Sequence, residues 1–511
     1  MKWKLLTPLC FLIPCGYFVL GAVAQNWHDE WGAPITLTYN SGTTQKLEQI
    51  TADCDWAIWD ATAMLNAKGK VTNPDPQCKP TVSQTAARAD VLGQGLGYSF
   101  EHEGKLIFLF GDTFGALNGN CTSPTGMPIS CTDYSPWTKV VNNYQYQAGD
   151  TMAWSNTQHG EDGLLLNYFM SSDQSHALVV QPEYQVSHCY PDLTCGTALP
   201  MGADNIPNSG ISLDGQIYIV ASTGTLNQDY STDYAVLAKF DERSGTFAAG
   251  RTISSVPNGG HFVYQALREF PWNEGWGRDS DDGLVVIAGL GQYRKSNIYL
   301  SIIPKRGFES GAGALYFTGL DAYGLPTWST NDDSSAVPIV TDLDPAKPTI
   351  GNLSLIYSRE LGLWLMTFDG GRAENATTGV YFSYAEQPWG PWSKPQFIFG
   401  DCQDHGYADF IFYYAASASQ NGCPTALPPG PVSYPASAGP IGPTGGPQDP
   451  AGNDPISTRG GGFAPQMIER FTQVEGDRLK IYYTLSTWNP YAVLKMESDF
   501  TISRNPWWGW D

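Results

Sequence analysis

The sequence predicts an all-β fold, a five-bladed β-propeller built from four-stranded antiparallel blades. A strand-turn-strand unit occurs clearly once and in weaker form four more times, and each copy is followed by a further β-rich run. Helical periodicity is nearly absent from the chain. Repetition of this size in an all-β sequence is typical of a radial repeat, so we expect one propeller domain rather than several separate domains.

The clearest copy of the unit covers residues 90–115, with a turn at Glu103 and Gly104 between two β-rich runs. The start of the first strand and the end of the second lie at the same edge of an antiparallel hairpin. Asp90 and Asp112 stand at those two ends. We therefore expect the two aspartates to be neighbours in space.

The other four copies follow in order, and each again pairs two β-rich runs. They lie at residues 211–220, 263–267 with 283–290, 353–367, and 466–470 with 479–485. Third strands are expected at residues 151–154, 234–240, 296–303, 378–384 and 491–497. The early run at residues 35–39 alternates like a strand, and it would complete the last blade if the two ends of the chain join to close the ring.

The first 24 residues predict a secretory signal peptide. They combine a positive start, an apolar stretch at residues 5–20 and a small-residue cleavage motif at residues 22–24. A membrane anchor is the alternative, but the apolar stretch is short and contains two prolines. We expect the mature chain, residues 25–511, to be a secreted, extracellular monomer with a Pro/Gly-rich surface loop at about 424–458.

Export would also permit disulfides and glycosylation. Eight cysteines remain after signal removal, and sequential pairing would close four local loops, although the sequence does not determine the pairing. These cysteines are Cys54, Cys78, Cys121, Cys131, Cys189, Cys195, Cys402 and Cys423. A zinc site is the alternative, but the chain has no Cys-x-x-Cys motif. Acceptor sequences for N-glycosylation occur at Asn120, Asn352 and Asn375, and Asn352 is not expected to carry a glycan because it falls at a predicted inner strand.

Charge and missing motifs exclude several function classes. The net charge of −22 argues against nucleic acid and anionic membrane surfaces as partners. The chain also lacks the motifs of serine hydrolases, zinc proteases, phosphate-loop enzymes and EF-hand proteins. Its 17 tryptophans and 27 tyrosines suit wet aromatic surfaces on which sugars stack, but they are ordinary strand residues too.

Polar residues gather at one predicted edge of the ring, where first strands start and second strands end. The candidates are Asp90, Asp112, Asp204, His261, Arg294, Asn352, Asp369, Trp488 and Asn489. Carboxylates, a cation, amides and an aromatic ring at one mouth suit a glycosidase, which needs one carboxylic acid and one carboxylate. Each residue also has a structural interpretation. Asp112 could cap a turn, and Asp90 could pair with Arg88 or Arg294.

An ordered set of motifs resembles a family of secreted propellers catalogued as domain of unknown function 4185. The motifs are Asp-Val-Leu-Gly at 90–93, Leu-Phe-Gly-Asp-Thr-Phe-Gly at 109–115, Ile-Pro-Asn-Ser-Gly-Ile at 206–211, Asn-Leu-Ser-Leu-Ile-Tyr at 352–357, Leu-Gly-Leu-Trp-Leu-Met at 361–366 and Ser-Thr-Trp-Asn-Pro-Tyr at 486–491. Some members of that family are assigned as endo-D-arabinanases. The resemblance implies a five-bladed propeller with an axial pocket and makes Asp90 and Asp112 the preferred catalytic pair.

The leading hypothesis is a secreted glycoside hydrolase acting on a furanoside-type, arabinan-like polysaccharide. Asp90 and Asp112 would be the catalytic carboxylates, and the other candidates would position the sugar. A non-catalytic carbohydrate-binding propeller is the alternative, since it needs the aromatic residues but no carboxylate pair. No cofactor or metal is indicated, and a structural calcium ion at the axis is the third hypothesis.

Overall fold

A computed structural model describes most of the predicted repeats. It covers residues 35–55, 79–91, 93–114, 121–122, 128–129, 148–170, 183–185, 198–200, 204–224, 230–241, 243, 245–270, 283–330, 332–344, 347–370, 379–401, 403–404, 406, 461–488 and 492–504. At some positions inside strands, including Asp112, Asp204 and Trp488, the backbone alone is described. The predicted signal peptide, the Pro/Gly-rich loop, Asn489 and most of the cysteines lie outside these residues.

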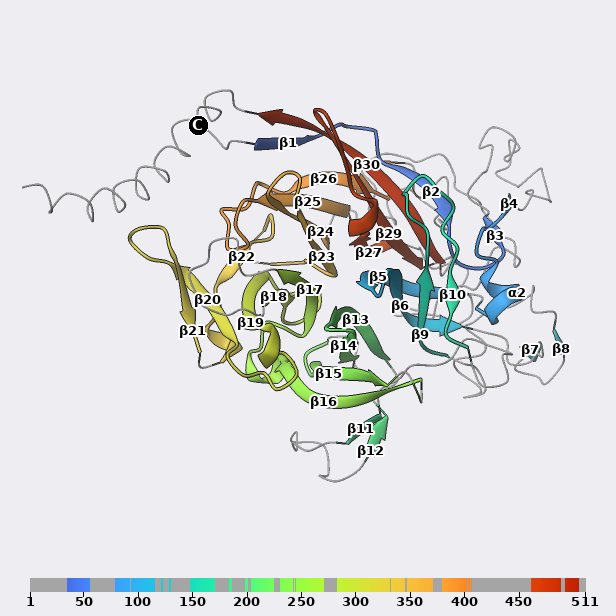
Figure 1. Cartoon of the computed structure of the whole chain (residues 1–511), viewed down its shortest axis with the longest axis horizontal. Helices are drawn as coiled ribbons and strands as arrows, with labels where there is room; N and C mark the ends of the chain where they lie inside the picture. Colours follow the sequence, from blue (N-terminus) through green and yellow to red (C-terminus); the bar gives the residue numbers. More distant parts are fainter. Residues whose placement is uncertain are drawn as a thin grey trace, which may run out of the picture.

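Five sheets stand around a common axis as the blades of a propeller, and their strands pair antiparallel apart from one parallel bridge at the outer side of the second blade, which confirms the predicted fold (Figure 1). The first blade has the order β10-β9-β6-β5 from outside to inside. Its strands are β5 (Gly93–His102), β6 (Lys105–Phe114), β9 (Ala148–Ser155) and β10 (Asn167–Tyr168). The fourth blade is the other simple one, with β23 (Leu353–Ser358), β24 (Leu363–Gly370), β25 (Gly379–Ala385) and β26 (Gln396–Gly400).

The remaining three blades exceed the expected four strands, since each sheet has six. The second comprises β13 (Asp204–Leu213), β14 (Gln216–Gly224), β15 (Tyr234–Asp241), β16 (Thr246–Ser255), β11 (Glu183–Gln185) and β12 (Ala198–Pro200). The third comprises β17 (Tyr264–Phe270), β18 (Leu284–Leu290), β19 (Ile298–Pro304), β20 (Leu315–Leu320), β21 (Pro326–Ser329) and β22 (Pro338–Val340). The fifth comprises β27 (Gly461–Met467), β28 (Gln473–Glu475), β29 (Arg478–Trp488), β30 (Ala492–Arg504), β1 (Ile35–Tyr39) and β2 (Gln45–Gln49).

The two ends of the chain close the ring in the fifth blade. Strand β1 pairs antiparallel with β30, from Ile35 opposite Arg504 to Tyr39 opposite Phe500. Leu37, in the middle of β1, is 1% exposed and packs into the core between the fourth and fifth blades. The prediction that residues 35–39 complete the last blade is confirmed. All five expected third strands are also confirmed, as β9, β15, β19, β25 and β30.

The strand registers define two ends of the propeller. The innermost strand of each blade starts opposite the end of the second strand, as Gly93 does opposite Phe114. We call this end the open edge. The opposite end, here called the hairpin edge, carries the turns between first and second strands. At Glu103 and Gly104 the φ angles are 46° and 79°, which is the left-handed pair that a tight two-residue hairpin needs.

Apolar faces of neighbouring blades pack on each other and hold the ring together. The largest cluster joins the first four blades and includes Leu109, Val220, Val286 and Trp364, none of which is more than 1% exposed. Outside the sheets, the described chain has one short α-helix, α2 (Thr85–Ala89), just before the first blade. No helix among the described residues is long and apolar enough to span a membrane.

Candidate active site

The open edge brings together most of the residues that the sequence selected. Asp90 directly precedes the first blade, Asp112 lies near the end of β6, and Asp204 is the first residue of β13. Asn352 directly precedes β23, and Asp369 is the last residue but one of β24, at the open edge. Arg294 follows β18, and Trp488 is the last residue of β29. Asn489 lies outside the described residues.

Asp90 occupies the left-handed backbone region, which aspartate tolerates better than most residues other than glycine. It ends α2 with φ 55° and ψ 31°, and its N–H donates to the Ala86 carbonyl at 3.0 Å. The bond from Asp90 to Ala86 closes the helix at a left-handed residue, a position that glycine usually occupies, and the Val91 N–H donates to the Thr85 carbonyl at 3.0 Å. A left-handed residue other than glycine costs roughly 1–2 kcal/mol.

Asp112 lies in a bulge that interrupts the hydrogen-bond ladders on both sides of β6. Toward β5, the register passes from Gly95 opposite Gly111 to Gly93 opposite Phe114, so Asp112 and Thr113 together face Gln94. Toward β9, it passes from Phe110 opposite Thr151 to Thr113 opposite Gly149. Gly111 and Asp112 together therefore face Asp150. Asp112 is the residue shared by the two irregularities, which we call the Asp112 bulge.

The Asp112 bulge is held by buried polar contacts on the neighbouring strands. The hydroxyl groups of Thr113 and Thr151 lie 2.8 Å apart across the β6–β9 ladder. Gln94 is fully buried on β5 and accepts a hydrogen bond from the Tyr168 hydroxyl at 2.8 Å. Burial raises the pKa of Tyr168 above its ordinary value, so this hydroxyl stays a donor. Bulges occur next to active sites because they redirect a side chain that a regular strand would alternate.

Asp150 is a third carboxylate at this end of the first blade, and the sequence reading missed it. It lies near the start of β9, is 2% exposed, and both of its carboxylate oxygens are out of contact with solvent. A signal was present, because Gly-Asp-Thr occurs at residues 111–113 and again at residues 149–151. Two identical triplets on predicted neighbouring strands could have identified it.

A buried ion pair links the third and fourth blades. The Arg294 guanidinium lies 3.3 Å from a carboxylate oxygen of Asp369, whose side chain is 1% exposed. The other oxygen of Asp369 accepts the Ala464 N–H from the fifth blade at 3.3 Å. Burial acts to lower the pKa of Arg294, but Tyr293 and Asp369 outweigh it and hold this pKa above its ordinary value. Asp369 thus joins three blades at the open edge.

Three tyrosines form a cluster beside this ion pair. The ring centroid of Tyr293 lies 5.0 Å from that of Tyr230 and 5.2 Å from that of Tyr264. The Tyr293 hydroxyl donates to the Asn352 side-chain oxygen at 3.1 Å. The Tyr264 hydroxyl donates to the buried carboxylate of Asp233. Burial, reinforced by the Asp233 charge, keeps the pKa of Tyr264 far above its ordinary value.

His261 packs over the middle strand of the third blade. Its ring stacks on Tyr299 of β19 with centroids 3.8 Å apart and an interplanar angle of 1°. Its backbone N–H donates to a carboxylate oxygen of Asp333 at 3.3 Å. Burial lowers the pKa of His261, against an opposing effect of Asp333, and burial raises the pKa of Asp333. These contacts tie His261 to the blade that carries it.

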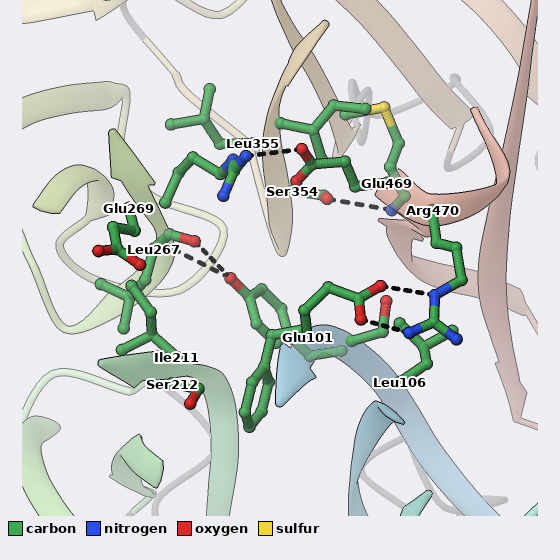
Figure 2. Close-up of a pocket in the computed structure, with 16 residues that line it drawn as sticks. Glu101, Leu106, Ile211, Ser212, Leu267, Glu269, Ser354, Leu355, Glu469 and Arg470 are labelled. Carbon is green, nitrogen blue, oxygen red and sulfur yellow. Dashed lines mark hydrogen bonds and ion pairs between the residues drawn. The ribbon is translucent and has the colours of Figure 1, made fainter. Parts of the chain in front are cut away.

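A cavity of about 110 Å³ lies at the other end of the axis, near the hairpin edge. Its charged groups are joined to one another across the blades (Figure 2). Arg470 binds both oxygens of Glu101, and Arg268 lies 2.7 Å from Glu469. The aspartates that the sequence selected lie at the opposite, open edge, and we therefore place the candidate active site there. No group of three metal-ligating side chains occurs among the described residues.

Solved structures that resemble the chain share little sequence with it. The glycoside hydrolase family 43 YxiA protein from Bacillus licheniformis is 8% identical, with a TM-score of 0.36 over 80% of this chain and 72% of that chain. The GH43 endo-arabinanase from Bacillus licheniformis is 11% identical, with a TM-score of 0.35 over 80% of this chain and 96% of that chain. Cellvibrio cellulosa alpha-L-arabinanase complexed with arabinohexaose is 10% identical, with a TM-score of 0.33 over 79% and 92%.

Scores this low carry no argument about activity, and the propeller architecture is established by the sheets themselves. A comparison with curated proteins found no match. A family model, by contrast, matches residues 81–497, which include all five innermost strands. The chain therefore belongs to the family described as a domain of unknown function (DUF4185).

Proposed function

We propose that this protein is a secreted glycoside hydrolase that cleaves an arabinan-like furanoside polysaccharide, with Asp90 and Asp112 as its carboxylate pair. The observation that carries the proposal is the Asp112 bulge, which interrupts both ladders of β6 at one aspartate. Asp90 stands at the same edge, three residues before Gly93, in a left-handed conformation. Two backbone features at the same end of the first blade, one at each aspartate, support this pair.

Glycoside hydrolysis needs these two groups in different protonation states. One carboxylic acid gives its proton to the glycosidic oxygen as the bond from that oxygen to the anomeric carbon breaks. The other carboxylate either takes a proton from the attacking water or bonds to the anomeric carbon itself, and water then releases the sugar. Each cycle consumes one water molecule and returns both carboxyl groups to their starting states.

The remaining candidates would position the sugar. Arg294 presents a guanidinium beside Asp369, and Asn352 presents an amide that Tyr293 holds in place. Such groups can bind sugar hydroxyls in a fixed orientation, which is how a binding site contributes to the rate. We assign the same role to Asp204, His261, Trp488 and Asn489, which the sequence selected at this edge.

The substrate class and the location rest on the sequence. The resemblance to secreted arabinan-degrading propellers supports an arabinan-like furanoside. The predicted signal peptide supports secretion to the extracellular space, with disulfides and N-glycans. The expected partner is the polysaccharide alone, with no cofactor.

Release of reducing ends from a polysaccharide panel tests the proposal. The panel includes mycobacterial arabinogalactan and plant arabinan, and the proteins are wild type, Asp90→Asn, Asp112→Asn and Asp401→Asn. Asp401 is the matched control, because it is a 1% exposed aspartate at the open edge that accepts the Gly462 N–H. We expect the first two variants to lose roughly 10²-fold or more in turnover while Asp401→Asn retains activity.

Two other outcomes would be informative. Glycan binding by folded wild type without new reducing ends would reject hydrolysis and indicate a carbohydrate-binding propeller. If the wild type is active and folded Asp112→Asn is equally active, Asp112 is not part of the mechanism. For an active wild type, proton NMR of the first product gives its anomeric configuration. Retention would indicate carboxyl groups about 5 Å apart, and inversion would indicate carboxyl groups about 6.5–9.5 Å apart.

A further inference from the structure

We propose that Thr85 is a positioning residue that holds the backbone of Asp90 in its left-handed conformation, and that Asp53 supports it by fixing the start of α2. The inference rests on the proposed function, which makes Asp90 catalytic, and deepens it by identifying residues that act on the reaction through Asp90. Neither Thr85 nor Asp53 was among the residues that the sequence selected.

Three residues other than glycine meet around Thr85 in the left-handed backbone region. Ala52, Gln84 and Asp90 have φ angles of 63°, 42° and 55°. Gln84 stands at the start of α2 and Asp90 at its end, and the Ala52 carbonyl accepts the Thr85 N–H at 3.3 Å. Residues with a Cβ atom disfavour this region, and they keep such a conformation where the surrounding structure holds it. The hydrogen bonds around α2 show what holds it here.

Thr85 bonds to the backbone just beyond Asp90 through two of its groups. Its carbonyl accepts the Val91 N–H at 3.0 Å, and its side-chain hydroxyl donates to the Val91 carbonyl at 2.8 Å. On the helix side, the Asp90 N–H donates to the Ala86 carbonyl at 3.0 Å. The planar peptide groups on both sides of the Asp90 α-carbon are therefore held, which restricts φ, ψ and the direction in which its side chain leaves the backbone.

The Thr85 hydroxyl also links this segment to the fifth blade. Its oxygen accepts the Ala52 N–H at 2.7 Å. The preceding residue, Thr51, accepts the Val493 N–H of β30 through its own hydroxyl at 3.1 Å. Because Thr85 is 1% exposed and its hydroxyl serves two backbone groups, we assign it no contact with the substrate. Its effect reaches Asp90 through the backbone alone.

Asp53 holds the other end of α2. One of its carboxylate oxygens accepts the N–H groups of Ala86 and Ala87 at 2.9 and 3.1 Å. These groups belong to the first turn, where the N–H groups of a helix have no carbonyl partner within the helix. An N-cap side chain usually accepts them from an extended backbone, but Gln84 at this position is left-handed. Asp53 thus supplies the cap from a distant part of the sequence, with a charge that suits a helix start.

Paired substitutions at Thr85 test the proposal. Thr85→Val keeps the shape of the side chain and removes the hydroxyl, whereas Thr85→Ser keeps the hydroxyl. Thr367→Val is the matched control, because Thr367 is fully buried in the fourth blade and its hydroxyl also donates to a backbone carbonyl, that of Pro465, at 2.8 Å. The readout is the carboxyl and α-carbon NMR signals of Asp90 in carbon-13 aspartate-labelled protein, assigned by their absence from Asp90→Asn.

We expect Thr85→Val to shift the Asp90 signals, and Thr85→Ser and Thr367→Val to leave them as in wild type. Asp53→Ala should shift the same signals, and Asp53→Asn, which keeps an acceptor oxygen, should shift them less. This second pair decides the matter if Thr85→Val does not fold. Unchanged Asp90 signals in folded Thr85→Val, or in Asp53→Ala where the first variant fails to fold, would overturn the proposal.

Kinetics separate this inference from the proposed function. In an active enzyme, folded Thr85→Val should lose about 10- to 100-fold in kcat while KM changes less than about threefold, because a displaced catalytic group slows the chemical step more than it weakens binding. Thr85→Ser should restore most of the rate. Equal loss of kcat in Thr85→Val and Thr367→Val would contradict a role through Asp90. If wild type releases no sugar, hydrolysis is rejected, and the NMR signals still decide whether Thr85 holds Asp90.

Discussion

Gly111 and Ile206 meet where the first blade presents its bulge to the second. A Cβ atom at Gly111 would lie 2.9 Å from Cγ2 of Ile206 and 3.1 Å from Cδ1 of Leu96. The backbone of β6 therefore reaches the neighbouring blade at a place where only glycine leaves enough room. This contact fixes the position of the residue that follows Gly111, and that residue is Asp112.

Replacing Gly111 by alanine should disturb the Asp112 bulge. We expect Gly111→Ala to lower the free energy of unfolding by about 1–3 kcal/mol, as overpacking does, and to reduce turnover as well. Urea denaturation and the reducing-end assay would measure the two effects. Adding Ile206→Ala removes the nearest methyl group, so the double variant should be less destabilised than the sum of the single variants. Strict additivity would show that the two residues do not interact.

Breaking the Arg294–Asp369 pair should be strongly destabilising. Arg294→Met leaves a 1% exposed carboxylate without its cation, and we expect a loss of about 3–5 kcal/mol in the free energy of unfolding. Lys239→Met is the matched control, because Lys239 and its partner Glu309 are 43% and 57% exposed. Removing that surface pair should change stability by no more than about 1 kcal/mol. If urea denaturation gave similar losses in the free energy of unfolding for Arg294→Met and Lys239→Met, burial would not explain the strength of the Arg294–Asp369 pair.

The lowered pKa of His261 should make the fold less stable in weak acid. Below its ordinary value of 6.5 the unfolded chain binds a proton at this histidine that the folded chain binds less well. The contribution of His261 to the free energy of unfolding is therefore fully present above about pH 6.5, and it is lost as the pH falls through the lowered pKa. Asp333 acts in the opposite sense, since its raised pKa makes stability decrease as the pH rises from 3.8.

Substitution separates the histidine contribution from that of Asp333. His261→Phe keeps the stack on Tyr299 and the backbone hydrogen bond to Asp333 but removes the titrating ring. We expect its Tm to fall less than that of wild type between pH 7 and pH 5. His159→Gln, which changes an exposed histidine, is the control and should follow wild type. Identical pH dependence in wild type and His261→Phe would refute the prediction.

Tyr98 joins the first and third blades across the axis. Its hydroxyl donates to the Leu267 carbonyl at 3.0 Å and accepts the Leu267 N–H at 3.1 Å. Burial raises the pKa of Tyr98 to about 12, so the hydroxyl keeps its proton. Tyr98→Phe would leave two backbone groups of an innermost strand without this partner, and we expect a loss of about 1–3 kcal/mol. Tyr323→Phe, at an exposed tyrosine, should change the urea midpoint little.

Local chemistry made most of the fold predictable. The turn at Glu103 and Gly104, the β-rich runs on either side of it and the closing strand at residues 35–39 all follow from alternation and turn preference. The structure reproduces each of them. Extra strands such as β21 and β22 were not predicted, since short outer strands depend on pairing with a distant partner more than on their own composition.

The candidate site was less predictable from the sequence than the fold. Equivalent hairpins were enough to predict that Asp90 and Asp112 share one edge, because hairpin geometry is local. Which side chains a residue near that edge contacts depends on tertiary packing, and the stack of His261 on Tyr299 is an example. No local pattern reports such a contact, since Tyr299 is 38 positions away by residue number.

By itself the sequence determined the repeat, the direction of each hairpin and the end of the propeller at which polar residues gather. Only the tertiary structure decided that two Gly-Asp-Thr triplets lie antiparallel, that Asp150 faces the Asp112 bulge, and that Asp369 links three blades. The physical reason is that alternation and turns act between neighbours in the chain. Register between the second and third strands of a blade, and packing between blades, depend on contacts that form only when the ring closes.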